Sequence, residues 1–248
     1  MTPAPGGLED RLSHVHLPLM PILLALGACA LLALVFGPQF YIRYALRTHG
    51  IERPDLPGTG GQLARHLLDQ AGLAHVEVSE TDTGDHYDPE TRAVRLLHQH
   101  HAGKSIAAVA IAAHEVAHAV QHAREEPGFM RRMAVVRKIG WIDTFGGIIL
   151  VSSPLLFLLI KAPILIVAQI VIGLLLLLVR VAVHLVTLPI ELDASFGKAL
   201  PVLREQGYLA EADLPAARQV LQAAAWTYVA AALATLLDVA RWFRIIRF

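Results

Sequence analysis

The pentapeptide His114-Glu-Val-Ala-His118 lies in the stretch Ser105-Ile-Ala-Ala-Val-Ala-Ile-Ala-Ala-His-Glu-Val-Ala-His-Ala-Val-Gln-His122, which is rich in alanine and contains neither glycine nor proline. This composition predicts a helix that has Ser105 as its N-cap and that ends no later than Gly128. Residues four apart on a helix face the same side, so both imidazoles point toward one spot.

Two histidines at this spacing, with a glutamate between them, are typical of the metal ligands and the general base of a zinc hydrolase. The pattern therefore indicates His114 and His118 as ligands and Glu115 as the base. The alternative is a buried helix with two core histidines. An apolar helix has no reason to bury a glutamate between two histidines unless a cation compensates its charge, so we favour the metal site.

The composition of the chain bears on its surroundings and partners. Hydrophobic residues make up 55% of the 248 residues and charged residues only 17%, with a mean hydropathy of +0.51. This is more apolar than an ordinary soluble domain and predicts membrane spans. The formal net charge is zero and the isoelectric point is near 7.3, so we expect no nucleic-acid partner. A single cysteine, Cys29, excludes an internal disulfide.

Several apolar runs predict where the chain crosses a membrane. Residues 17–36 carry no charge over twenty positions and read as a transmembrane anchor after an N-terminal tail, residues 1–16. Residues 142–188 read as a transmembrane hairpin that turns at Lys161 and Ala162. Residues 220–248 form a weaker fourth apolar helix that either spans or packs. Arginines beside these runs predict that residues 37–140 are cytoplasmic.

Residues 37–140 have a mixed composition and predict a small domain outside the membrane. A helix is expected over Thr59–Ala71, with Thr59 as its cap, and strands over Val76–Ser79 and Arg92–Leu97. Strands followed by the motif helix form a layout in which an extended substrate can lie along a sheet edge. The predicted fold class is a mainly α multi-pass membrane protein with a small α+β zincin-like metallopeptidase domain that carries the motif on a helix.

A catalytic zinc keeps three protein ligands, so a third must come from elsewhere in the chain. His122 lies about 12 Å from His114 along a straight helix, which is too far for one ion. Glu191 is the better candidate, in the segment 189–219. It falls on one polar stripe of an otherwise apolar helix, with Arg180, His184 and Thr187.

These motifs together resemble the YugP-like neutral zinc metallopeptidases of bacterial membranes. The resemblance covers roughly residues 40–240. It rests on the His-Glu-x-x-His helix, on Asp85-His-Tyr-Asp-Pro89 before it, and on Leu-Pro-Ile-Glu-Leu-Asp-Ala-Ser195 and Ala223–Ala232 after it. The arrangement is more distantly similar to HtpX-type and CAAX prenyl membrane proteases, in which an Ala-Asp pair follows the ligand glutamate. Here Ala194-Ser195 stands in that place, and Asp193 is a candidate for the missing carboxylate.

The resemblance implies a zinc-dependent endopeptidase of the bacterial plasma membrane, and the arginines that flank the predicted spans place its site on the cytoplasmic side. Its partners would be a protein or peptide substrate and membrane lipid, and the sequence carries no signal of an oligomeric state. Zinc would be held by His114, His118 and Glu191, and Glu115 would act as general base.

Candidates for stabilising the oxyanion are His86, Tyr87 and His184. The alternative function is a non-catalytic membrane scaffold or metal-handling protein with a structural zinc site. The presence of Glu115 discriminates, because a closed structural site needs no base.

Overall fold

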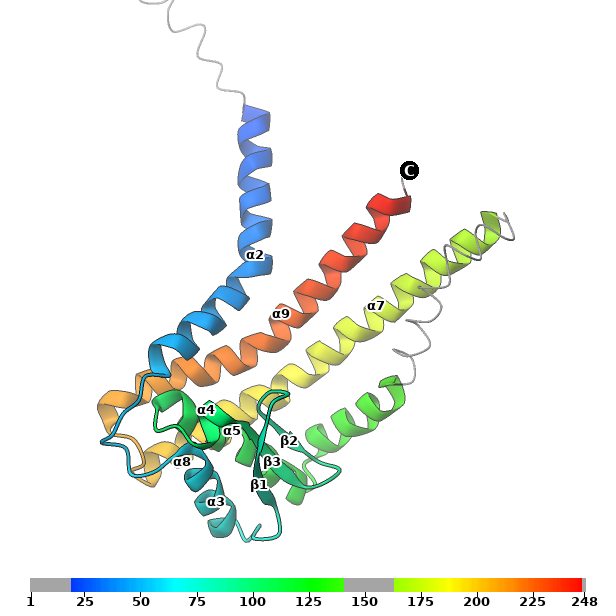
Figure 1. Cartoon of the computed structure of the whole chain (residues 1–248). Coiled ribbons are helices and arrows are strands. Elements are labelled where there is room, and N and C mark those ends of the chain that lie inside the picture. Colours follow the sequence, from blue (N-terminus) through cyan, green and yellow to red (C-terminus); the bar gives the residue numbers. More distant parts are fainter. Residues whose placement is uncertain (1–18, 141–162, 247–248) are drawn as a thin grey trace, which may run out of the picture. The chain divides into compact units, whose positions relative to one another are not determined.

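The computed structural model describes residues 19–140 and 163–246 (Figure 1). Its elements in chain order are α2 (Leu19–His49), α3 (Gly60–Gln70), β1 (Glu77–Thr81), β2 (His86–Asp88), β3 (Ala93–Leu97), α4 (His98–His101), α5 (Ile106–Ala123), helical residues 127–140, α7 (Pro163–Leu192), the π-helix η1 (Asp193–Ala199), α8 (Leu200–Glu205), the short 3-10 helix η2 (Glu211–Asp213) and α9 (Leu214–Ile246). The described part of the chain is thus mostly helical with one small sheet.

The local predictions for the helices around the motif are confirmed. Ser105 caps α5 by accepting a hydrogen bond from the backbone N–H of Ala108, and Thr59 caps α3 through a capping box with Gln62. Helix α5 ends at Ala123, before the predicted limit, because Glu125 takes a left-handed backbone conformation with φ of 50°. The next helix begins directly afterwards at residue 127.

The sheet has three strands in the order β1-β3-β2, of which the sequence predicted two. β1 runs parallel to β3, and β2 pairs with β3 in the antiparallel sense, with Tyr87 opposite Val94. β2 lies inside the segment that was expected to be a connection. Its three residues are too few to show an alternation of apolar and polar side chains, and Gly84 and Pro89 on either side are typical of turns.

The predicted multi-pass membrane architecture is wrong for the described residues. No helix within residues 19–140 and 163–246 is both long and apolar enough to cross a membrane. Within the described residues, the uncharged runs are parts of longer helices that also contain charged residues. Helix α2 continues past Phe36 through Arg43 to His49, and α7 continues past Leu188 to include Glu191.

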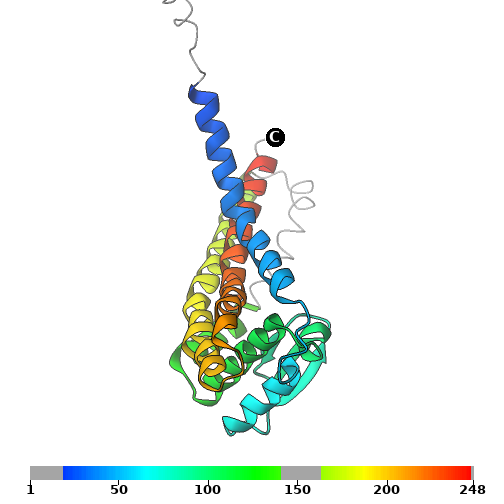
Figure 2. The same ribbon diagram turned by 90° about the vertical axis from the view of Figure 1, so that its left-hand side faces the viewer.

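Two further expectations depended on these spans. The first apolar run of the hairpin and its turn at Lys161 lie outside the described residues. The cytoplasmic placement of residues 37–140 rested on the arginines that flank the predicted spans, and it loses that basis. Residues 220–246 belong to α9, which packs along α7, as both views of the ribbon show (Figures 1 and 2).

The chain divides into two compact units, residues 1–37 and residues 38–248, and the second unit contains the sheet and the candidate site. Within this unit α5 is the central helix: α3, η1 and α9 all pack against it. The approach of α3 to α5 requires glycine at position 60, because a Cβ there would collide with the carbonyl oxygens of His100 and Ala108. Almost every residue of α5 is buried as a result.

Candidate metal centre

Helix α5 brings the two motif histidines together in the protein interior. The ring centroids of His114 and His118 lie 4.7 Å apart, and their Nε2 atoms lie 3.2 Å apart. Both side chains are buried. Two ligand atoms of a tetrahedral zinc with bonds of about 2.0–2.1 Å are separated by about 3.3 Å, so the pair has the spacing of two ligands of one ion.

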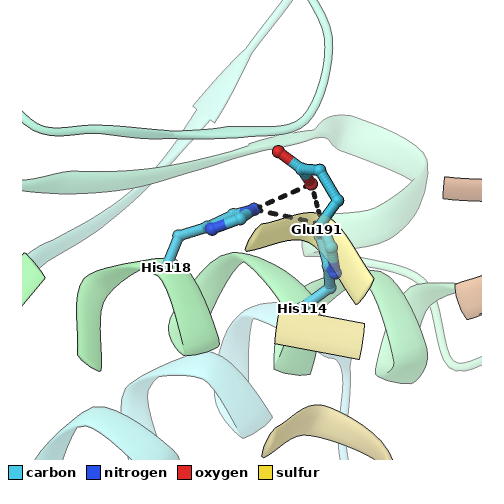
Figure 3. Close-up of side chains that lie close together, drawn as sticks. All are labelled: His114, His118 and Glu191. Carbon is cyan, nitrogen blue, oxygen red and sulfur yellow. Dashed lines mark hydrogen bonds and ion pairs between the residues drawn. The ribbon is translucent and has the colours of Figure 1, made fainter. Parts of the chain in front are cut away.

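Helix α7 contributes the third group, Glu191, from 77 residues further along the chain than His114. Its Oε2 atom lies 3.2 Å from His114 Nε2 and 3.1 Å from His118 Nε2, so the three atoms form a nearly equilateral triangle (Figure 3). Among the described residues, this is the one set of three or more His, Cys, Asp or Glu side chains that could hold a metal ion.

The tautomer of His118 follows from its hydrogen bond to Gln121. The side-chain amide of Gln121 donates to Asp193 Oδ2 (2.8 Å) and to the backbone carbonyl of Ile190 (3.2 Å), both of which only accept. Its carbonyl oxygen must therefore be the atom that lies 2.9 Å from His118 Nδ1. The proton is consequently on Nδ1, and the lone pair of Nε2 points at Glu191.

Ser195 fixes the other imidazole in the same way. Its hydroxyl lies 3.3 Å from the backbone carbonyl of Leu221, to which it can only donate. The hydroxyl oxygen is then left to accept a hydrogen bond from His114 Nδ1, at 3.1 Å. Both histidines thus hold their Nδ1–H groups away from the centre and present Nε2 lone pairs to it, as metal ligands do.

The electrostatics of this arrangement call for a cation. Two Nε2 lone pairs and a carboxylate oxygen converge without a proton between them, and Glu191 Oε1 is also buried and has no hydrogen-bond partner among the described residues. Burial raises the pKa of Glu191, whereas positive charge at the centre, such as protonated His114 and His118 would carry, lowers that pKa well below the usual range. The buried anion and the donor set of two nitrogens and one oxygen fit zinc.

Glu115 lies beside the centre without belonging to the set of ligands. It is buried, and burial raises its pKa from 4.5 to about 7, while the positive charge of a protonated His114 would oppose that shift. A hydrogen bond with the backbone of Tyr87 in β2 also opposes it. This carboxylate is therefore close to the protonation midpoint that suits a group exchanging protons at neutral pH.

The centre opens into a cavity of about 450 Å³. Its walls are formed by the C-terminal part of α2, by β2 and the turn after it, by α5, by helical residues 127–140, by the end of α7 and by α9. The lining residues include the apolar side chains Ile42, Leu46, Ile111, Phe129, Met133, Val136 and Val220. The site therefore combines buried polar groups with an apolar wall, as ligand and substrate sites commonly do.

Two further polar side chains, those of Arg132 and Tyr228, line this cavity near Glu191. Neither was predicted as a site residue. Arg132 Nη1 lies 3.7 Å from Glu191 Oε1, and Arg132 Nη2 lies 3.4 Å from the hydroxyl of Tyr228. Burial and the nearby Glu191 carboxylate raise the pKa of Tyr228 above its usual value. Tyr228 belongs to the Ala223–Ala232 segment that carried the family resemblance, but nothing in its spacing pointed to the site.

Of the three side chains that were predicted to stabilise an oxyanion, the structure places His86 and Tyr87 at the cavity, and the role of all three stays a prediction. His86 Nδ1 lies 2.8 Å from the carbonyl oxygen of Gly84, and the Tyr87 hydroxyl lies 2.9 Å from His122 Nδ1. His86 and Tyr87 both line the cavity, whereas His184 is not among its described lining residues and packs its ring 6.4 Å from that of Tyr228. These hydrogen bonds hold β2 in place.

Asp193 reaches the centre only through an intermediary. Gln121 joins it to His118, and Lys198 forms ion pairs with Asp193 and, at 3.1 Å, with Glu126. The direct contact to a histidine is made instead by Ser195, the residue that departs from the Ala-Asp pattern. Gln121 follows His118 by three positions and shares its helix face, so spacing alone could have indicated this role.

A helix-borne His-Glu-x-x-His motif joined by a distant carboxylate defines the class of zinc hydrolases. The comparisons agree: the chain belongs to the family described as "putative neutral zinc metallopeptidase", whose model matches residues 24–247. It is similar to the "putative membrane protease YugP" of Bacillus subtilis (strain 168), with 35% identity over 220 residues, covering 87% of this chain and 93% of the relative. No solved structure matches.

Proposed function

We propose that this protein is a zinc-dependent endopeptidase. One observation carries the proposal: three buried ligands have their lone pairs turned to one point, while Glu115 in the same cavity stays outside the set. A structural zinc site is closed by a fourth protein ligand and needs no neighbouring base. Three ligands leave a coordination position for water, and the adjacent Glu115 carboxylate can accept a proton from that water.

Each residue has a part in peptide hydrolysis. Zinc, when bound, acidifies a water molecule and polarises the peptide carbonyl. Glu115 takes a proton from the water as its oxygen forms a bond to the carbonyl carbon, and returns that proton to the amine nitrogen as the C–N bond breaks. His114, His118 and Glu191 hold the ion, and Ser195 and Gln121 keep the two imidazoles in the tautomer that can bind it.

The position of β2 supports an extended peptide substrate. β2 lies at an edge of the three-stranded sheet, and its residues His86 and Tyr87 line the cavity beside Glu115. An edge strand offers unpaired backbone groups to which a peptide can add as a further strand. The apolar side chains of the cavity wall favour substrates with apolar residues next to the cleaved bond.

We further propose that the protein works at a membrane, on proteins found there. The support is the printed name of the Bacillus subtilis relative and a row of outward-facing apolar side chains on α7, including Ile164, Leu175 and Leu178, whose exposed fractions are 72%, 57% and 63%. Flotation of the purified protein with lipid vesicles tests this: association is expected, and recovery of all the protein away from the vesicles would contradict it.

The test of catalysis is Glu115→Gln. This variant should retain zinc, because Glu115 is not a ligand, and should lose roughly 10²–10⁴-fold in the rate of casein cleavage, because the general base is gone. The matched control is Glu205→Gln, which removes an exposed carboxylate on α8 and should cleave at the wild-type rate. Wild-type cleavage by Glu115→Gln would show that the base is wrongly assigned. A zinc-loaded wild type that cleaves no protein would favour a structural metal site.

A further inference from the structure

We propose that Tyr228 and Arg132 bind the oxyanion that forms when the peptide carbonyl is attacked, an inference that rests on the proposed peptidase function. The two residues come from α9 and from helical residues 127–140 and meet at the cavity wall beside Glu191. Neither belongs to the sequence motifs from which the ligands and the base are recognised.

The geometry places two hydrogen-bond donors together at one edge of the candidate metal centre. The guanidinium of Arg132 lies 3.4 Å from the Tyr228 hydroxyl and 6.0 Å from the centre of its ring. It lies 3.7 Å from Glu191 Oε1, which accepts no hydrogen bond among the described residues. Donors aimed at a point next to the metal are what a tetrahedral intermediate requires, since negative charge develops there only during the reaction.

The alternative donors are already engaged elsewhere. The hydroxyl of Tyr87 is paired with His122, and His86 Nδ1 is paired with the carbonyl of Gly84. Both contacts stabilise β2, the strand on which we expect the substrate to lie. Tyr228 and Arg132 also have partners, but these partners are each other and Glu191, so both polar groups are held next to the candidate metal centre.

The two side chains have complementary chemistry for this task. Arg132 carries a permanent positive charge, which stabilises a developing negative charge more than a neutral donor does. Its side chain lines the cavity and is 26% exposed, so it is accessible from there. The Tyr228 hydroxyl is a neutral donor at pH 7 and is held on a long helix that packs against both α5 and α7. Arg132 thus contributes a positive charge, and Tyr228 contributes a hydrogen-bond donor in a fixed position.

The first test is Tyr228→Phe, which removes the donor and keeps the ring. We expect kcat to fall about 10²–10³-fold, with KM nearly unchanged and zinc content equal to that of the wild type. Binding of a phosphinic peptide, whose tetrahedral oxygens imitate the intermediate, should weaken by a similar factor in calorimetry, whereas binding of a product peptide should not change. Tyr208→Phe is the control, because Tyr208 packs on His66 away from the cavity and should behave as the wild type.

Arg132→Gln should act in the same direction, and the double variant should lose less than the product of the two single losses, because both donors serve one oxygen. If Tyr228→Phe cleaves and binds the phosphinic peptide as the wild type does, the proposal is wrong. If Tyr228→Phe instead loses zinc, Tyr228 supports Glu191 rather than the intermediate, and the proposal is again wrong. These outcomes leave the peptidase function intact, since that function depends on Glu115→Gln.

Discussion

The candidate metal centre has two halves that are built in different ways. The half on α5 is local: both histidines and the candidate base lie within five consecutive residues of one buried helix. The half around Glu191 is assembled from the end of α7, the π-helix η1 and α9. The first half is preorganised by helical periodicity alone, whereas the second depends on how distant elements pack.

The π-helix η1 belongs to the second half and carries two residues that contact the centre or its neighbours. Turns of π-helix are rare and occur frequently at functional sites. Here η1 begins two residues after Glu191, and Ser195 and Asp193 both project from it. Ser195 contacts His114, and Asp193 contacts the side-chain amide of Gln121. The local half therefore carries two of the three candidate ligands, and the assembled half adds Glu191 together with Ser195, which contacts His114, and Asp193, which contacts Gln121.

The largest effect should come from removing Glu191, the one candidate ligand of the assembled half. Glu191→Ala leaves two imidazoles, too few for a catalytic zinc, and should purify nearly free of zinc and inactive. Asp193→Ala is the matched control from the same segment and should still load with excess metal, because its carboxylate touches the centre only through Gln121. Metal analysis of both proteins checks this. If Glu191→Ala contained zinc and Asp193→Ala did not, Asp193 would be the ligand and Glu191 would not.

The pH dependence of stability should report on Glu115 in the metal-free protein. Its pKa rises from 4.5 to about 7 on folding, so the unfolded chain releases this proton first as pH increases. The free energy of unfolding should therefore fall between pH 4.5 and 7, by up to about 3 kcal/mol from this group.

Glu115→Gln removes the titration, so metal-free Glu115→Gln should be more stable than the metal-free wild type at pH 7.5 and similar to it at pH 4.5. Urea unfolding at the two pH values measures the difference. If the free energies of unfolding of the variant and the wild type differed by the same amount at both pH values, Glu115 would not titrate in this range.

A smaller effect should follow when either imidazole loses its Nδ1 partner. Ser195→Ala and Gln121→Ala should each bind zinc 10–100-fold more weakly, because the tautomer and the orientation of the ring are no longer fixed. Gln99→Ala, an exposed change near the sheet, is the control. Competition with a zinc chelator gives the affinities. An unchanged affinity in either variant would mean that packing alone orients that histidine.

The smallest effect is expected for Gly197→Ala within the π-helix. Alanine normally stabilises a helix relative to glycine by about 0.5–1 kcal/mol. Here the new Cβ would overlap the carboxylate of Asp193, which must then move away from Gln121. We expect the helical gain to be cancelled and zinc affinity to fall less than tenfold, as measured by thermal melting with and without zinc. A clear gain in stability with unchanged affinity would show that Asp193 adjusts freely.

The sequence predicted the local half better than the assembled half, for a physical reason. Helix α5 was predictable because its cap, its composition and its spacing all lie in one segment. The Glu191 stripe was visible because it too follows helical periodicity. Tyr228 and Arg132 carry no periodic signal, since each enters the site through the packing of one helix on another. The apolar runs indicated spans that the described helices do not form, because an uncharged run does not determine where a helix begins or ends.

The separation of His114 and Glu191 along the chain gives the metal a second consequence. An ion bound to both would join points 77 residues apart, as a disulfide does, and would close a loop that includes helical residues 127–140 and nearly all of α7. Binding energy at such a junction becomes folding energy. Without the metal, the buried Glu191 carboxylate between α5 and α7 keeps only the 3.7 Å ion pair with Arg132 among the permanent positive charges of the described residues, so we expect the protein to open there first. The supply of zinc would then control how long the protein resists degradation by other proteases, in addition to any activity that depends on the metal.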